Sequence, residues 1–412
     1  MVLGIILTIL LLNFGLDRIL SWLNLRHQQP QLPDELAGDL DASQYAKAYQ
    51  YHQVNHRFDL FRSSISMGVM LCLLVSGAFG WLDEQLRTIT EDPIWLPLLF
   101  FGVLFVVSDI MTIPFQWYRT FTIETRFGFN KTTPRTFWMD KIKGYVLTIL
   151  IGGIVLTTLL ALIQSLGPNF WLWFWLFISV FMFGVNLFYT SLLLPIFNKL
   201  TPLEGGPLRN AIEDYSEEVS FPLDNIFVMD GSRRSSKANA FFSGLGRRKK
   251  VVLFDTLIEK HGEAELVAVL AHEVGHYKKR HIQQGLALGI MQTGLMLFLL
   301  SLLLFMPELS AALGSGSGEA VIHLNLIAFG LLYSPISLVI SLLMNVFSRK
   351  NEFEADAFAA NTYQAGPLKQ ALVKLHGDSL SNLTPHPWYV FFHYSHPPLL
   401  QRLAALGKSE TL

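Results

Sequence analysis

The chain has 412 residues, of which 51% are hydrophobic and 15% are charged, and its formal net charge is -1. So large an apolar fraction predicts an integral membrane protein, because a soluble chain of this length needs less apolar surface. The nearly neutral charge gives no support to nucleic-acid binding. The single cysteine, Cys72, lies in an apolar run, which excludes a disulfide within the chain and a cysteine-rich structural zinc site.

Seven segments are long and apolar enough to cross a bilayer, which takes about 20 helical residues. They lie at residues 2–22, 64–83, 94–117, 143–165, 170–195, 283–306 and 322–346. The first has no basic residue before its apolar run and no small-residue cleavage site after it. We therefore expect a retained anchor rather than a signal peptide.

The charges of the connecting loops predict an orientation. Residues 23–63 and 118–142 carry several Lys and Arg residues, whereas 166–169 and 307–321 carry none. Basic loops stay in the cytoplasm, so the N-terminus is expected outside and the C-terminus inside.

Asp109 lies inside the third predicted span, where a carboxylate is costly unless it faces water or a polar partner. Two interpretations stay open. The carboxylate either lines a wet cavity or is a structural group paired with Ser or Asn.

A polar insertion separates the fifth and sixth spans. Its patterns predict a helix over residues 207–219, strands at 225–229 and 250–254, and a second helix over 263–279 that runs almost directly into the sixth span. The seventh span runs in turn into a helix over 352–360.

The fold class is therefore a mainly α, polytopic membrane protein with a cytoplasmic-side, zincin-like catalytic region and a small β element. We divide it into residues 1–195 (spans one to five), 196–282 (catalytic insertion), 283–346 (spans six and seven) and 347–412 (C-terminal catalytic region).

The motif His272-Glu273-Val274-Gly275-His276 predicts a zinc site on the helix over 263–279. Histidines four residues apart lie on one helix face, so both imidazoles can reach one metal ion. Glu273 can then serve as general base toward the water that the metal activates. The alternative is a helix surface that carries two histidines by chance.

A catalytic zinc ion needs a third protein ligand and an open position. Glu352 is the expected ligand, and Asp356 lies one turn along the same face, where it can orient a ligand imidazole. Glu354 points to another side of that helix, so we expect it outside the site. The alternative for Glu352 and Asp356 is a solvated helix face.

If the site hydrolyses a peptide bond, the oxyanion that forms on the carbonyl needs a hydrogen-bond donor besides zinc. On sequence alone His396 and His393 are equal candidates, and either could be a surface histidine. Arg402 is either a partner of Asp356 or a cation on a helix surface.

The chain resembles the CAAX prenyl protease 1 family, which are seven-span membrane zinc metalloendopeptidases. The resemblance covers most of the chain and rests on blocks in the same order, at residues 123–131, 195–202, 239–242, 252–257, 272–276, 351–356 and 393–398.

The resemblance implies one Zn²⁺ per chain and a role for each matched residue. Zinc would be held by His272, His276 and Glu352, with Glu273 as base, His396 as oxyanion donor, and Asn239 with Ala240 holding the substrate backbone on a strand edge. It also implies that the spans surround a water-filled chamber with the site facing inward.

Members of this family remove the last three residues of a C-terminal Cys-aliphatic-aliphatic-any motif whose cysteine is prenylated. We therefore expect a membrane-embedded zinc metalloendopeptidase whose partners are a peptide or protein substrate and the lipid bilayer. One alternative is a membrane-protein quality-control protease without prenyl specificity. A second is a non-catalytic chamber or transport protein with a structural metal.

Two departures from the family concern the compartment. The outer loop at 307–321 is short, and no retrieval signal follows Leu406. Both favour a bacterial inner membrane over the endoplasmic reticulum.

Overall fold

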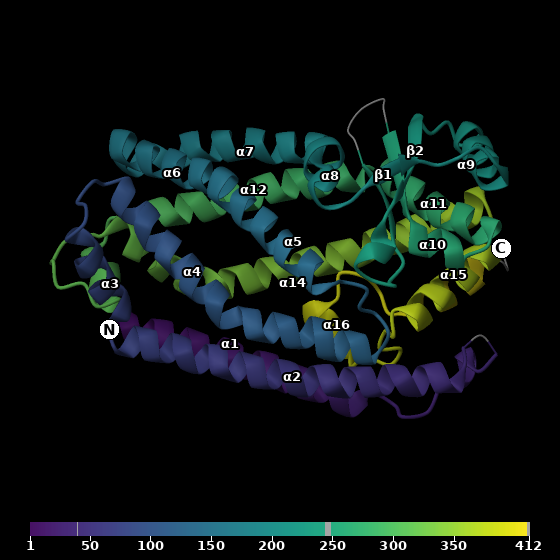
Figure 1. The fold of residues 1–412 in the computed structure, drawn as a ribbon, viewed down its shortest axis with the longest axis horizontal. Coiled ribbons are helices and arrows are strands. Elements are labelled where there is room, and N and C mark those ends of the chain that lie inside the picture. Colours follow the sequence, from purple (N-terminus) through teal and green to yellow (C-terminus); the bar gives the residue numbers. More distant parts are fainter. Residues whose placement is uncertain (39, 244–248, 410–412) are drawn as a thin grey trace.

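The structure, a computed structural model, describes residues 1–38, 40–243 and 249–409. Long helices run side by side along the molecule, and a small sheet with several shorter helices lies at one end (Figure 1). The N-terminus lies at the opposite end from that sheet (Figure 1). The long helices are α1 (Val2–His27), α2 (Ala42–Val75), α4 (Trp95–Tyr118), α5 (Pro134–Leu147), α6 (Gly153–Leu166), α7 (Phe170–Phe188), α12 (His281–Leu303) and α14 (Ile322–Thr362).

The shorter helices complete the two ends. They are α3 (Ala78–Arg87), α8 (Leu194–Phe197), α9 (Pro207–Glu218), α10 (Asp255–Lys260), α11 (Glu263–Lys278), α13 (Pro307–Ala312), α15 (Ala365–Asp378), α16 (Pro387–His393) and α17 (Leu399–Ser409). A π-helical turn over Arg119–Glu124 continues α4.

Within the described residues, 6 continuous helical stretches are long and apolar enough to cross a membrane. One of them, Pro134–Phe197, has 64 residues, far more than one crossing requires. It turns back at Gly167, whose φ of 53° suits glycine, and α6 then packs against α7 (Figure 1). This stretch contains both the fourth and the fifth predicted spans. The six helical stretches therefore agree with the seven predicted spans.

The second predicted span, at residues 64–83, lies only partly within the longer helix α2, which ends at Val75. Helix α2 begins at Ala42, where the Asp41 side chain accepts a hydrogen bond from the Ser43 N–H and caps the helix. Its polar first half is helical because Tyr45, Ala48 and Tyr51 are buried along one face.

Asp109 is paired, but not with Ser or Asn. Its carboxylate accepts hydrogen bonds from the Lys141 ammonium, at 2.5 Å, and from the Tyr145 hydroxyl, both on α5. An ion pair of this kind offsets the cost of a carboxylate among membrane helices.

The sheet has four strands in the order β1-β2-β4-β3, with bounds Leu200–Pro202 (β1), Leu223–Met229 (β2), Ala240–Ser243 (β3) and Lys249–Phe254 (β4). Strands β2 and β4 pair in parallel and match the two strands predicted from the residue pattern. The pattern did not predict the antiparallel edge strands β1 and β3, although the family resemblance implied a strand edge at Asn239 and Ala240. The edge strands were missed because each is only 3 or 4 residues long. A buried cluster between the sheet, α11 and α15 holds this end of the molecule together.

Candidate metal centre

Helices α11 and α14 cross at unusually short range, and a glycine allows it. A Cβ atom at Gly275 would lie 3.0 Å from the Cα of Ala355 and 3.2 Å from the Cβ of Phe358. Because Gly275 lies between the two motif histidines, this close crossing brings both of them against the side chains of α14.

The two motif histidines and Glu352 converge at that crossing. The Nε2 atoms of His272 and His276 lie 3.1 Å apart. The carboxylate of Glu352 reaches both, at 3.5 Å from His272 Nε2 and 3.3 Å from His276 Nε2. One ligand atom from each residue lies within 4.8 Å of the others. The helix spacing of the motif therefore produces the three-residue cluster that the sequence predicts.

The donors of this cluster suit a zinc ion. Two imidazole nitrogens and one carboxylate oxygen are a common ligand set for catalytic zinc. The Oε2 atom of Glu352 is buried and has no hydrogen-bond partner among the described residues. The Arg402 guanidinium forms an ion pair with this oxygen at 3.5 Å, and a cation between the three side chains would give it a closer partner.

Asp356 and Arg402 lie directly behind His272. The Asp356 Oδ1 atom is 2.8 Å from His272 Nδ1, and the Arg402 guanidinium donates to both carboxylate oxygens, at 2.8 and 2.5 Å. Both side chains are buried, with 1% of Asp356 and 6% of Arg402 exposed. The structure therefore places Arg402 beside Asp356 rather than on a helix surface, and this pair fixes the ring of His272.

Of the two downstream histidines, only His396 reaches the cluster. Its Nε2 atom lies 3.3 Å from Glu352 Oε1, while 66% of its side chain stays exposed toward the cavity. The ring of His393 instead lies 4.5 Å from the ring of Tyr389, inclined at 39°, and its Nε2 atom is 3.7 Å from Asp17 Oδ1. The geometry thus favours His396 over His393 as the candidate oxyanion donor, a choice that the residues alone left open.

A cavity of about 320 Å³ lies over the cluster. One wall is Asn239 and Ala240, at the start of β3, which is an edge strand among the described residues. Its aliphatic wall consists of Leu257, Val269, Leu368, Leu372 and Leu375. An extended peptide could pair with β3 and place a side chain against the aliphatic wall.

Glu273 and His272 have shifted pKa values. Burial raises the pKa of Glu273 above its usual value, although the neighbouring His272 and His276 oppose this rise. Burial alone would lower the pKa of His272, but its hydrogen bonds to Asp356 and Glu352 outweigh burial and raise it to about 9. A carboxylate with a raised pKa is a better general base near neutral pH.

Arg349, one turn before Glu352 on α14, was not among the residues predicted from the sequence. Its guanidinium donates to the backbone carbonyls of Val390, at 3.2 Å, and Tyr394, at 2.5 Å. It thereby holds the segment that leads to His396. Backbone carbonyls carry no residue-type signal, so no motif could reveal this contact.

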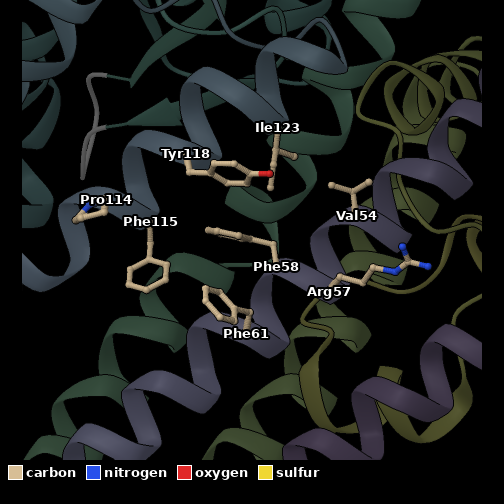
Figure 2. A pocket seen from close by; sticks show the side chains of 8 residues that line it. All are labelled: Val54, Arg57, Phe58, Phe61, Pro114, Phe115, Tyr118 and Ile123. Carbon is tan, nitrogen blue, oxygen red and sulfur yellow. The ribbon is translucent and has the colours of Figure 1, made fainter.

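A second cavity, of about 520 Å³, lies between α2 and the end of α4 and is lined mainly by aromatic side chains (Figure 2). Phe58, Phe61, Phe115 and Tyr118 surround it, and among the described residues that line it Arg57 carries the charge (Figure 2). The candidate metal ligands lie instead on α11 and α14.

Comparisons with known proteins agree with this geometry. Residues 21–199 match a family model described as the CAAX prenyl protease N-terminal region with five membrane helices. Residues 202–410 match peptidase family M48.

Named relatives cover nearly the whole chain. A CAAX prenyl protease 1 homolog of Oryza sativa is 34% identical over 93% of this chain and 91% of its own length. CAAX prenyl protease 1 of Saccharomyces cerevisiae is 32% identical over 94% of this chain and 91% of its own. The crystal structure of S. mikatae Ste24p superposes with a TM-score of 0.94 at 30% identity and covers 98% of this chain and 99% of that one. The chain therefore belongs to the CAAX prenyl protease 1 family of M48 membrane metallopeptidases.

Proposed function

We propose that this chain hydrolyses peptide bonds with one Zn²⁺ held by His272, His276 and Glu352. The observation that carries the proposal is the convergence of two imidazole Nε2 atoms on the buried Glu352 carboxylate, whose Oε2 has no hydrogen-bond partner among the described residues. When bound, the ion would supply a Lewis acid that polarises the scissile carbonyl and activates water.

The remaining side chains have proton-transfer and binding roles. Glu273 takes the proton from the attacking water and passes it to the leaving amine. His396 donates a hydrogen bond to the carbonyl oxygen as negative charge develops there. Asn239 and Ala240 hold the substrate backbone along the edge of β3.

For the substrate we propose a protein that ends in a prenylated Cys-aliphatic-aliphatic-any motif. The relatives' names support the prenylated C-terminus, and the aliphatic wall of the cavity suits the residues after the cysteine. An apolar cavity of about 530 Å³ suits the isoprenoid, and its walls are mainly Phe181, Met182, Val185, Phe241, Phe242 and Ile282. Phe241 directly follows Ala240 in the chain, so this cavity and the cavity over the metal cluster share residues of β3.

We also propose that the metal centre faces the cytoplasm. The basic segment at 118–142 contacts the metal-bearing end of the molecule, where Asn130 bridges to Ser235 and the Lys131 N–H donates to the Arg234 carbonyl. By the positive-inside rule this end is cytoplasmic. The bacterial inner membrane, the inner chamber and the four-part division of the chain stay predictions.

Two peptides that differ only by a farnesyl group on the cysteine test the substrate. Zinc-loaded protein in detergent should release the last three residues of the farnesylated peptide and leave its unprenylated twin largely intact, as measured by mass spectrometry. Equal cleavage of both peptides would instead support the quality-control protease. Failure to cleave either peptide or an unfolded membrane protein would contradict peptidase activity itself.

A further inference from the structure

The ring of His276 has a partner on the side that faces away from Glu352. Its Nδ1 atom lies 2.9 Å from the Nδ1 atom of His281, with the two rings inclined at 72°. Because His276 Nε2 faces the other candidate ligands, its Nδ1 carries the proton and donates to His281.

His281 in turn has an acidic partner. Its Nε2 atom lies 3.3 Å from Oε2 of Glu354. Since His281 accepts at Nδ1, its proton is on Nε2 and is donated to that carboxylate. Only 7% of His281 is exposed, so its ring depends on these two contacts rather than on water. The other oxygen of Glu354, Oε1, lies 3.7 Å from Lys350 at the surface.

The turn between α11 and α12 brings His281 to this position. Arg280 adopts a φ of 61°, in the left-handed region that non-glycine residues seldom enter. Helix α11 ends just before this residue, and His281, the first residue of α12, packs against the ring of His276. Such backbone outliers cluster at functional sites.

Helix α14 thus sends carboxylates to both motif histidines. Asp356 contacts His272 directly, and Glu354 reaches His276 through His281. We infer that His281 and Glu354 are positioning residues for the metal site proposed above: they fix the tautomer and direction of the His276 ring and increase its basicity toward the ion. Glu354 was expected outside the site, and this inference gives it a positioning role next to the three candidate ligands. The side chain does point away from Glu352, but toward His281.

The variants His281→Phe and Glu354→Gln test this inference. His281→Phe keeps a ring but removes the acceptor, and zinc affinity should fall roughly 10–100-fold, as expected on loss of an outer-shell partner. Glu354→Gln keeps an acceptor and loses the charge, so the loss should be smaller. Affinity would be measured by competition with a chromophoric chelator on the full-length protein in detergent, and Co²⁺-substituted protein should show shifted visible bands in His281→Phe.

His323→Phe is the matched control. His323 is also a buried histidine paired with a carboxylate, because its Nε2 atom lies 2.8 Å from Asp83 Oδ1, but its partners lie outside the metal cavity. This variant should lose stability and keep the zinc affinity of the parent chain.

The experiment distinguishes a failure of this inference from a failure of the proposed zinc site. Weaker zinc binding in His281→Phe and Glu354→Gln, with His323→Phe unchanged, supports the inference. A lower Tm of the metal-free protein with unchanged zinc affinity and Co²⁺ spectrum would overturn it, since the pair would then only join α12 to α14. If the parent chain itself bound no zinc, the proposed metal site would fail first.

Discussion

Glu273 lines the cavity beside the motif histidines and is not one of the three clustered ligands. Replacing it by Gln keeps its size and removes the base. We expect cleavage to fall about 10²–10⁴-fold, the usual contribution of a general base, with zinc content unchanged. Initial cleavage rates and elemental analysis of zinc, both measured on one preparation, test the expected fall in cleavage and the unchanged zinc content. Wild-type rates in Glu273→Gln would assign the proton transfer elsewhere.

The raised pKa of His272 predicts how zinc loading depends on pH. With a folded pKa of about 9, the ring holds a proton at pH 7 when no metal is bound, and zinc requires the neutral ring. Zinc binding at pH 7 should therefore release a proton, and affinity should rise with pH until about pH 9. Calorimetry in buffers of different ionisation enthalpy measures the released proton. Affinity independent of pH between 6 and 9 would contradict this.

The close crossing of helices α11 and α14 positions the side chains of the candidate metal site. Gly275→Ala would place a methyl group 3.0 Å from the Ala355 Cα, which is backbone and cannot move aside alone. We expect the helices to separate, with a loss of about 1–3 kcal/mol in stability and weaker zinc binding.

Gly262→Ala, where a Cβ meets nothing within 4 Å, is the control for that substitution. Thermal unfolding and zinc titration of the two variants give the comparison. Parent-like zinc affinity in Gly275→Ala would show that the close crossing is not needed for the site.

Elements with a strong local pattern could be predicted from the sequence. Span length and apolarity located the membrane helices, and the spacing of His272, His276 and Glu352 located the cluster. The first half of α2 could not be predicted, because it depends on packing against distant segments. Strand β3 was missed by the residue pattern because it has only 4 residues. The contact between His281 and Glu354 joins residues 73 positions apart, so no local spacing in the sequence indicates it.

At the scale of the whole molecule, membrane helices and metal centre form one continuous body. Helix α14 runs from the predicted membrane region through Glu352 and Asp356 without a break. Helix α11 joins α12 through the single turn at Arg280. Ligands on helices that continue into the bundle are held more rigidly than ligands on loops, which suits a site whose geometry sets the reaction.

Zinc content and peptide cleavage measured on the same samples test most directly whether His272, His276 and Glu352 hold a catalytic ion. The full-length chain should contain one zinc per molecule, lose both zinc and farnesyl-peptide cleavage on chelation, and regain both when zinc is restored. His276→Ala should retain little zinc and little cleavage. Full cleavage by the chelated protein, or by zinc-free His276→Ala, would contradict a catalytic zinc at this cluster.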